Sequence, residues 1–272
     1  EKIAKEYNSI TNELDVIEHV FKLACGLDSL IIGEKQILSQ VRFAYTNAQQ
    51  EKTLDNTLEL LFQNVINTAK DIHKETNLSE KSQSISSAAI DLANSICGPI
   101  KNKSIMVLGA GKMAELALEH IEKIGGAKET VVLNRSPHKV IEFSDKYKFD
   151  KSIPFEEVYK SINDVDVVIT ATGAPHFILF AEQFTQNRDD SSKPLHVFDI
   201  SLPRNVDPEF GKLENVKLLD IDSLQTIYNQ NTKIKDEDKK QIEELISSGI
   251  KTFLEDISSQ EVAETIKELK SK

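Results

Sequence analysis

Residues 104–126, SIMVLGAGKMAELALEHIEKIGG, contain the pattern that decides the fold. An apolar run leads into a glycine turn and the turn leads into a helical pattern, as in the fingerprint of dinucleotide-binding domains. Gly109 permits the tight turn, Gly111 lets the backbone approach a pyrophosphate, and Ala114 lets the helix pack on the strand. The amino end of the helix offers free N–H groups to phosphates. The stretch predicts a bound dinucleotide; the alternative is a glycine-rich turn with a lost or different ligand.

Four further apolar runs predict a parallel sheet. They lie at residues 130–135, 165–173, 195–204 and 216–222, and helical patterns occupy 136–147 and 155–164. Strands that are apolar throughout and alternate with helices belong to a sheet covered on both faces. We therefore predict an α/β fold, with a Rossmann-type domain at residues 101–228.

Helical patterns precede this domain. Between residues 14 and 76, apolar residues such as Val16, Val20 and Leu23 recur at helical spacing. A further helix follows, with Ser82 or Ser84 as its N-cap, and it ends at Gly98-Pro99. We place a helical domain at residues 1–100.

A long helix follows the α/β domain. Residues 232–272 contain no proline and only one glycine, Gly249, and their pattern is charged and amphipathic. We predict one long helix, or two nearly continuous ones, in a final segment at 229–272. Such a helix lacks a core of its own, so we expect it to pack on the rest of the chain or on a partner.

The residues at the end of the second predicted strand indicate whether the ribose of the dinucleotide carries a 2′-phosphate. The sequence there is Asn134-Arg135-Ser136, with no acid to repel a 2′-phosphate and a guanidinium that suits one. We predict NADPH rather than NADH as the cofactor; the alternative for Arg135 is a solvated surface charge. The predicted cofactor-binding residues are Gly109, Gly111, Lys112, Met113, Ala114, Asn134, Arg135, Ser136, Thr172 and Gly173.

Two later loops have open roles. In TATGAP, residues 170–175, small residues either let a nicotinamide or ribose lie against the backbone or form a tight turn. In DISLPRNVDP, residues 199–208, Asp199 and Arg204 could pair and fix the loop. A structural and a catalytic role for this second loop are equally open.

Composition excludes several classes of protein. The 272 residues carry a formal charge of −11, which argues against a nonspecific nucleic-acid binder. No apolar run approaches the roughly 18 residues of a membrane span. Two cysteines, Cys25 and Cys97, do not suggest a disulfide framework, so we predict a cytoplasmic protein. No metal site is predicted.

A polar cluster lies in an apolar frame near the start of the chain. His19 precedes ACGLDSLIIGEKQIL, residues 24–38, in which Asp28, Ser29, Glu34 and Gln36 stand close together. A lone helical histidine is more often packed or surface-exposed than catalytic, but the polar residues that lie near His19 in the sequence favour a functional site. Residues 19–45, HVFKLACGLDSLIIGEKQILSQVRFAY, closely resemble glutamyl-tRNA reductases. Three further stretches agree in order and spacing, SISSAAIDLA, GAGKMAELA with LNRS, and DISLPRNVDP, so the resemblance covers about residues 14–230.

The resemblance implies a reaction. In the family a cysteine thiolate attacks the ester that joins glutamate to its tRNA, and NADPH reduces the thioester to glutamate-1-semialdehyde, the first step of tetrapyrrole biosynthesis. It also implies three parts: a catalytic domain, of which residues 1–100 would be the helical portion, an NADP(H) domain, and a spinal helix at 229–272 leading to a dimerisation domain.

The resemblance also implies site residues and partners. His19 matches the family's active-site histidine, and Ser29 matches a residue that contacts the glutamyl group. The implied substrate-binding residues are Asp28, Ser29, Glu34 and Gln40. The implied partners are glutamyl-tRNA(Glu), a second copy of the chain, and glutamate-1-semialdehyde aminomutase, with no membrane.

One departure limits the expected activity. The family's nucleophile lies in an upstream Cys-Asn-Arg-Thr-type motif that the 272 residues do not contain, so we expect this chain alone to be inactive. Cys25 stands where the family has a small residue, and a buried helical cysteine is usually a small hydrophobe. The alternatives are a shikimate-dehydrogenase-like NADP oxidoreductase and a noncatalytic NADP-binding protein.

Overall fold

The computed structural model describes residues 9–29, 31–76, 78, 84–188, 193–231 and 236–270. These residues form two compact units. The first unit combines the described residues before 84 with those from 231 onward, and the second unit is residues 84–230.

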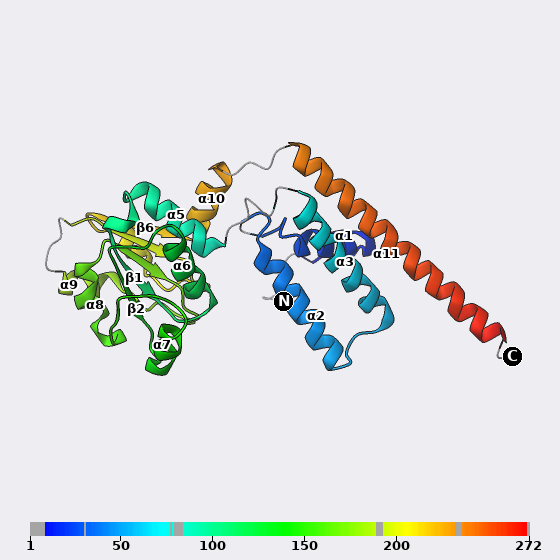
Figure 1. The fold of residues 1–272 in the computed structure, drawn as a ribbon, viewed down its shortest axis with the longest axis horizontal. Coiled ribbons are helices and arrows are strands. Elements are labelled where there is room, and N and C mark those ends of the chain that lie inside the picture. The colour runs from blue at the N-terminus through cyan, green and yellow to red at the C-terminus, as the bar shows by residue number, and fades with distance from the viewer. Residues whose placement is uncertain are drawn as a thin grey trace. The chain divides into compact units, whose positions relative to one another are not determined.

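The second unit is built on a parallel six-stranded sheet (Figure 1). The strand order is β3-β2-β1-β4-β5-β6 and every pairing is parallel. The strands are β1 (Ser104–Leu108), β2 (Glu129–Leu133), β3 (Lys151–Ser152), β4 (Val167–Thr170), β5 (Leu195–Asp199) and β6 (Val216–Asp220). The predicted Rossmann-type α/β fold is confirmed, and all five predicted strands are present. The edge strand β3 was missed because its two residues are polar and exposed.

The sheet is covered on both faces, since every residue of β1 and β4 is buried. The helices of this unit are α5 (Ile85–Ile96), α6 (Lys112–Lys123), α7 (Pro137–Ser144), α8 (Val158–Ser161), α9 (Ala181–Asn187) and α10 (Ile221–Asn231). Short 3-10 turns lie at Ile100–Asn102, Phe155–Glu157, Ile162–Asp164 and Pro208–Lys212. The helices α9 and α10 were not predicted.

Helix α5 belongs to the sheet unit. Its N-cap is Ser84, whose hydroxyl accepts from the Ser87 N–H at 3.1 Å. It packs on α6, where Nε2 of His120 lies 2.7 Å from a carboxylate oxygen of Asp91. The division between the units therefore lies one helix earlier than the boundary we placed at residue 100. Gly98-Pro99 does end a helix, but that helix, α5, packs on α6, which follows it in the chain.

The first unit is a helical cluster. Its helices are α1 (Glu13–Ala24), α2 (Lys35–Gln50), α3 (Asn56–Glu75) and α11 (Asp236–Lys270). Asn12 caps α1 and Asp55 caps α3, each by accepting backbone N–H groups through its side chain. The C-terminal pattern forms one continuous helix, α11, over its described residues. None of the helices in the described part of the chain is both long and apolar enough to cross a membrane.

Helix α11 packs on α1 and α3, as Figure 1 shows. Its Ile242, Ile246 and Phe253 are buried in one cluster with residues of both helices. At Gly249 the helices approach so closely that a Cβ atom would lie 2.2 Å from Thr68 Oγ1 and 2.8 Å from Phe21 Cε1. The absence of a side chain at this position is therefore what permits the contact.

A substitution at Gly249 tests this contact. Alanine is the better helix former by about 1 kcal/mol, so in an unpacked helix Gly249→Ala would be stabilising. Against α1 and α3 the added methyl group overpacks the core, at a cost of roughly 1–3 kcal/mol. We expect faster hydrogen exchange at the amides of Ile242 and Phe253.

The matched control is Ser247→Ala, two residues earlier on the exposed side of α11. It should leave exchange unchanged or slow it slightly, since alanine has the higher helix propensity. Slower exchange in both variants would contradict the packed arrangement.

Candidate functional site

The glycine turn after β1 is the centre of the site. Gly109 has φ of +123°, and a Cβ there would lie 2.3 Å from the carbonyl oxygen of Ala171 at the end of β4. Its N–H donates to the Leu133 carbonyl of β2 at 2.7 Å. Only glycine fits, because both the backbone conformation and the close approach exclude a side chain. The turn is thereby held against the ends of both neighbouring strands.

Gly111 has a different role from Gly109. Its φ is −111°, which any residue adopts, but no heavy atom lies within 4 Å of the position of a Cβ. The space in front of the amino end of α6 is therefore open to a ligand. Ala114 is fully buried one turn later, as expected of a residue that packs the helix on the strand.

A pocket of about 200 Å³ lies beside this turn, at the carboxyl ends of β1, β2 and β4. This is where the strand order reverses, the usual ligand position in open α/β sheets. Its lining residues are Gly109, Leu133, Asn134, Arg135, Phe155, Thr172, Gly173, Ala174 and Ile178.

The structure brings together five of the predicted cofactor-binding residues, from three different loops. Four lining residues were not in the predicted set: Leu133 and Ala174 adjoin predicted residues, whereas Phe155 and Ile178 lie in segments with no predicted cofactor residue. Phe155 follows the unpredicted strand β3, so its sequence position gave no reason to place it near the turn. Ile178 comes from a loop without regular structure, and no sequence pattern could have placed it.

Arg135 is exposed at the pocket. Within the described residues, no carboxylate forms an ion pair with its guanidinium. The neighbouring Asn134 amide donates to the Ser136 carbonyl at 3.2 Å, which fixes the turn that presents Arg135. The guanidinium is therefore available to an anionic ligand.

The other five predicted cofactor residues do not line the pocket: Gly111, Lys112, Met113, Ala114 and Ser136. The Lys112 ammonium lies 2.7 Å from the Glu115 carboxylate. Burial raises the pKa of Glu115, but hydrogen bonds from Lys112 and Tyr147 outweigh it and lower the pKa overall. Lys112 is thus engaged within α6.

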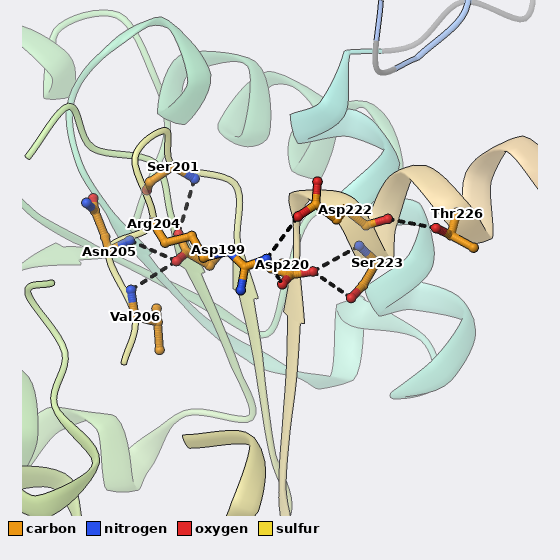
Figure 2. Close-up of polar contacts among 9 residues, drawn as sticks. All are labelled: Asp199, Ser201, Arg204, Asn205, Val206, Asp220, Asp222, Ser223 and Thr226. Carbon is orange, nitrogen blue, oxygen red and sulfur yellow. Dashed lines mark hydrogen bonds and ion pairs between the residues drawn. The ribbon is translucent and has the colours of Figure 1, made fainter. Parts of the chain in front are cut away.

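The structure does not show the pairing of Asp199 with Arg204 that the sequence left possible. Figure 2 shows Asp199 accepting from backbone N–H groups of the following loop, while Arg204 points away to Asp220 and Asp222. The Arg204 guanidinium lies 2.9 Å from the Asp222 carboxylate. Asp199 is 1% exposed, and its oxygens accept from the loop and from the Thr170 hydroxyl of β4. The exposed Arg204 instead joins the last carboxylate of β6, Asp220, with one in the first turn of α10, Asp222.

The N-terminal polar cluster lies in the first unit. His19 Nδ1 is 3.2 Å from a carboxylate oxygen of Asp28, and both side chains are nearly half exposed. The loop that carries Asp28 is closed by the Gly33 N–H, which donates to the Gly26 carbonyl at 2.8 Å. The structure therefore brings His19 and Asp28 together, as the sequence suggested.

The other predicted substrate residues surround this loop in different ways. The Ser29 hydroxyl donates to the carbonyls of Gly26 and Ile31, so it stabilises the loop. Burial raises the pKa of the Glu34 carboxyl. Gln40 is exposed on α2, and in the described part of the chain no hydrogen bond joins it to the loop.

Neither cysteine is activated. Burial raises the pKa of Cys25 to about 12, and Cys25 is fully buried in the first unit's core. Burial also raises the pKa of Cys97 to about 11. Because the thiolate is the reactive form, both thiols are poor nucleophiles near neutral pH.

Comparison with known proteins shows the same two regions. Residues 1–76 match the family described as "Glutamyl-tRNAGlu reductase, N-terminal domain", and residues 91–227 match "Shikimate / quinate 5-dehydrogenase". The chain is 39% identical over 268 residues to the glutamyl-tRNA reductase of Carboxydothermus hydrogenoformans, covering 98% of this chain and 59% of that protein. It is 37% identical over 257 residues to the enzyme of Bacillus subtilis, covering 94% and 56%.

A solved structure agrees. The glutamyl-tRNA reductase from Methanopyrus kandleri matches with a TM-score of 0.52 and 31% identity, covering 90% of this chain and 61% of that chain.

The chain belongs to the glutamyl-tRNA reductase family. It spans 56 to 59% of the length of the two relatives named above. The match at 1–76 contains the His19 cluster, whereas the sheet unit matches a dehydrogenase family of another name. The glycine turn alone does not distinguish the two families. The match at residues 1–76 does, because it is to the glutamyl-tRNA reductase family alone.

The acidic group at the end of β6 gives a test of stability against pH. Burial raises the pKa of Asp220, but hydrogen bonds from Ser223 and the charge of Arg204 lower it below its ordinary value of 3.8. A depressed folded-state pKa contributes stability that is present above the ordinary pKa and is lost as pH falls through the folded value. We expect Asp220→Asn to destabilise the protein by about 1 kcal/mol at pH 7. The difference from the unmodified chain should shrink below pH 3.8.

Urea unfolding at a series of pH values measures this difference. Asp222→Asn is the control, since Asp222 also pairs with Arg204 but is 76% exposed, and it should cost little at any pH. A penalty for Asp220→Asn that does not change with pH would contradict the assignment.

Proposed function

We propose that the chain binds NADPH in the pocket beside Gly109. The bound NADPH would be the reductant that converts glutamyl-tRNA(Glu) to glutamate-1-semialdehyde, the first step of tetrapyrrole biosynthesis. The observation that carries the proposal is Arg135, which lines the pocket and forms no ion pair with a described carboxylate, in a chain whose relatives are named glutamyl-tRNA reductase. The named relatives match almost the whole chain, including the N-terminal cluster, and this favours the reductase over the shikimate-dehydrogenase-like alternative.

The residues of the pocket fit NADPH. The open space at Gly111 lies before the amino end of α6, where N–H groups and the helix dipole favour a pyrophosphate. The exposed guanidinium of Arg135 suits a 2′-phosphate, and no acid follows β2 to repel one. The small side chains of Thr172, Gly173 and Ala174 leave room for the other ribose. When bound, the cofactor supplies a hydride.

The substrate end of the proposal rests on His19. With its Nδ1 facing Asp28, the imidazole is held in one orientation, and its Nε2 is left for a reacting carbonyl. Asp28 would position His19, and Glu34 and Ser29 would frame the glutamyl group. The thioester step requires an accessible thiolate, which neither Cys25 nor Cys97 offers. The family's upstream cysteine would supply it.

The proposed partners follow from the family. They are glutamyl-tRNA(Glu) as substrate, a second copy of the chain, and glutamate-1-semialdehyde aminomutase as recipient of a reactive aldehyde. The proposed location is the cytoplasm.

The first test concerns cofactor choice. NADPH should bind more tightly than NADH, and Arg135→Ala should remove most of the preference, about tenfold or more, because a charge-assisted hydrogen bond to the 2′-phosphate is lost. Titration of cofactor fluorescence measures both affinities. Arg188→Ala is the control, since Arg188 lies over the Phe184 ring in the same unit and does not line the pocket. Equal affinities for the two cofactors in the unmodified chain would refute the NADPH assignment.

The second test concerns activity. We expect no semialdehyde from the 272-residue chain, and turnover once it is fused to a relative's N-terminal segment that carries the cysteine motif. In the fusion, His19→Ala should reduce turnover by about 10²–10⁴-fold and leave NADPH affinity unchanged, because general acid–base help is lost. Cys25→Ala is the control and should have little effect. If the short chain is active and Cys25→Ala abolishes that activity, Cys25 is the nucleophile and the proposal is wrong.

A further inference from the structure

The Asn205 side chain makes several hydrogen bonds to loops beside the pocket, although it does not line the pocket. It is fully buried in the loop after β5. The carbonyl oxygens of Ala174 at 3.0 Å, His176 at 3.3 Å and Pro203 at 3.2 Å all lie within hydrogen-bonding distance of its amide nitrogen, whose two N–H groups are shared among them. Its amide oxygen accepts from the Thr172 hydroxyl. Both polar atoms of the side chain are therefore engaged, and three of their four partners belong to the loop after β4.

That loop has little structure of its own. Residues 171–178 contain no helix or strand, so their own backbone does not fix their conformation. The backbone carbonyl of Asn205 accepts from the N–H groups of Ile178 at 2.7 Å and Leu179 at 3.1 Å. One residue thus holds the loop at both of its ends. Thr172 and Ala174, which line the pocket, are bonded to the side chain directly.

Asn205 is itself fixed by the sheet. Its N–H donates to Asp199 Oδ2 at 2.8 Å, and the Val206 N–H donates to the same oxygen at 2.9 Å (Figure 2). The other Asp199 oxygen accepts from the Thr170 hydroxyl of β4 at 2.6 Å. Because Asp199 is the last residue of β5 and is 1% exposed, this anchor is rigid.

The position of the loop tells which part of a dinucleotide it would touch. Arg135 follows β2, on one side of the glycine turn, and the loop follows β4, on the other side. If the pyrophosphate lies at the amino end of α6, the half of the molecule beyond it extends over β4 and β5. The wall formed by Thr172, Gly173 and Ala174 then adjoins the half that ends in the nicotinamide.

We propose that Asn205 is a positioning residue that sets the pocket wall of Thr172, Gly173 and Ala174 and so seats the nicotinamide half of the cofactor. This role rests on the proposed function. A planar amide offers two donors and an acceptor at fixed angles, and it joins the carbonyls and the hydroxyl of the loop in one arrangement. Without it, those partly buried groups lose their protein partner and the loop relaxes toward other conformations.

The chain contains a matched control. Asn163 also donates its side-chain amide to three carbonyls of the same unit, those of Tyr159 at 3.4 Å, Lys160 at 3.3 Å and Asn187 at 2.7 Å. It does not line the pocket and none of its three acceptors does. Asn205→Ala and Asn163→Ala therefore remove the same side chain and the same kind of contact, but only the first acts on the pocket wall.

The experiment compares two ligands in the full chain. NADPH contains both halves of the dinucleotide, whereas adenosine 2′,5′-bisphosphate contains only the half expected at Arg135. Asn205→Ala should weaken NADPH binding by about tenfold and change bisphosphate binding less than twofold. It should also alter the emission of bound NADPH, which comes from the reduced nicotinamide. Asn163→Ala should leave all three measurements unchanged.

The outcomes separate the two proposals. An unmodified chain that binds neither ligand overturns the NADPH pocket and this role together. An unmodified chain that binds both, with equal losses for both ligands in Asn205→Ala or no loss for either, overturns the positioning role alone. If Asn205→Ala does not fold, Thr172→Val removes the hydroxyl contact with nearly the same shape. It must then weaken NADPH selectively, or the role is refuted.

Discussion

The contact between Gly109 and the end of β4 is the constraint on which the sheet unit depends. The glycine backbone lies so close to the Ala171 carbonyl that a single methyl group would prevent it. This closeness brings the end of β1 against the end of β4 and directs the chain into α6. The pocket lies where the strand order reverses, because the chain adds β2 and β3 on one side of β1 and β4, β5 and β6 on the other.

The loop after β5 is held in place by one buried carboxylate. Asp199 ends β5, and its two oxygens fold the following loop back onto the sheet. A buried charge is costly unless hydrogen bonds satisfy it, so the loop has little freedom to move away from Asp199. The loop in turn carries Asn205 toward the pocket and Arg204 toward β6. The walls of the pocket are thus determined by groups that no ligand would touch.

The core of the helical unit is formed by helices from the two ends of the chain. The unit contains no sheet in its described residues, and its core forms where α11 returns to α1 and α3. The contact depends on Gly249, just as the pocket depends on Gly109, but here the glycine serves packing between helices. The His19 and Asp28 pair lies on this unit, so the histidine is presented by a frame that includes residues more than two hundred positions later in the chain.

The sequence by itself determined the elements whose cause is local. Apolar runs specified five of the six strands, glycines and capping residues specified the turn and the helix ends, and LNRS placed an arginine after β2. The tertiary structure alone decided which distant groups meet. It brought Phe155 to the pocket, paired Arg204 with Asp220, and gave Asn205 its partners in the loop after β4. Those contacts depend on how strands order in the sheet and how irregular loops lie over their ends, and neither follows from residue spacing because the partners are far apart along the chain.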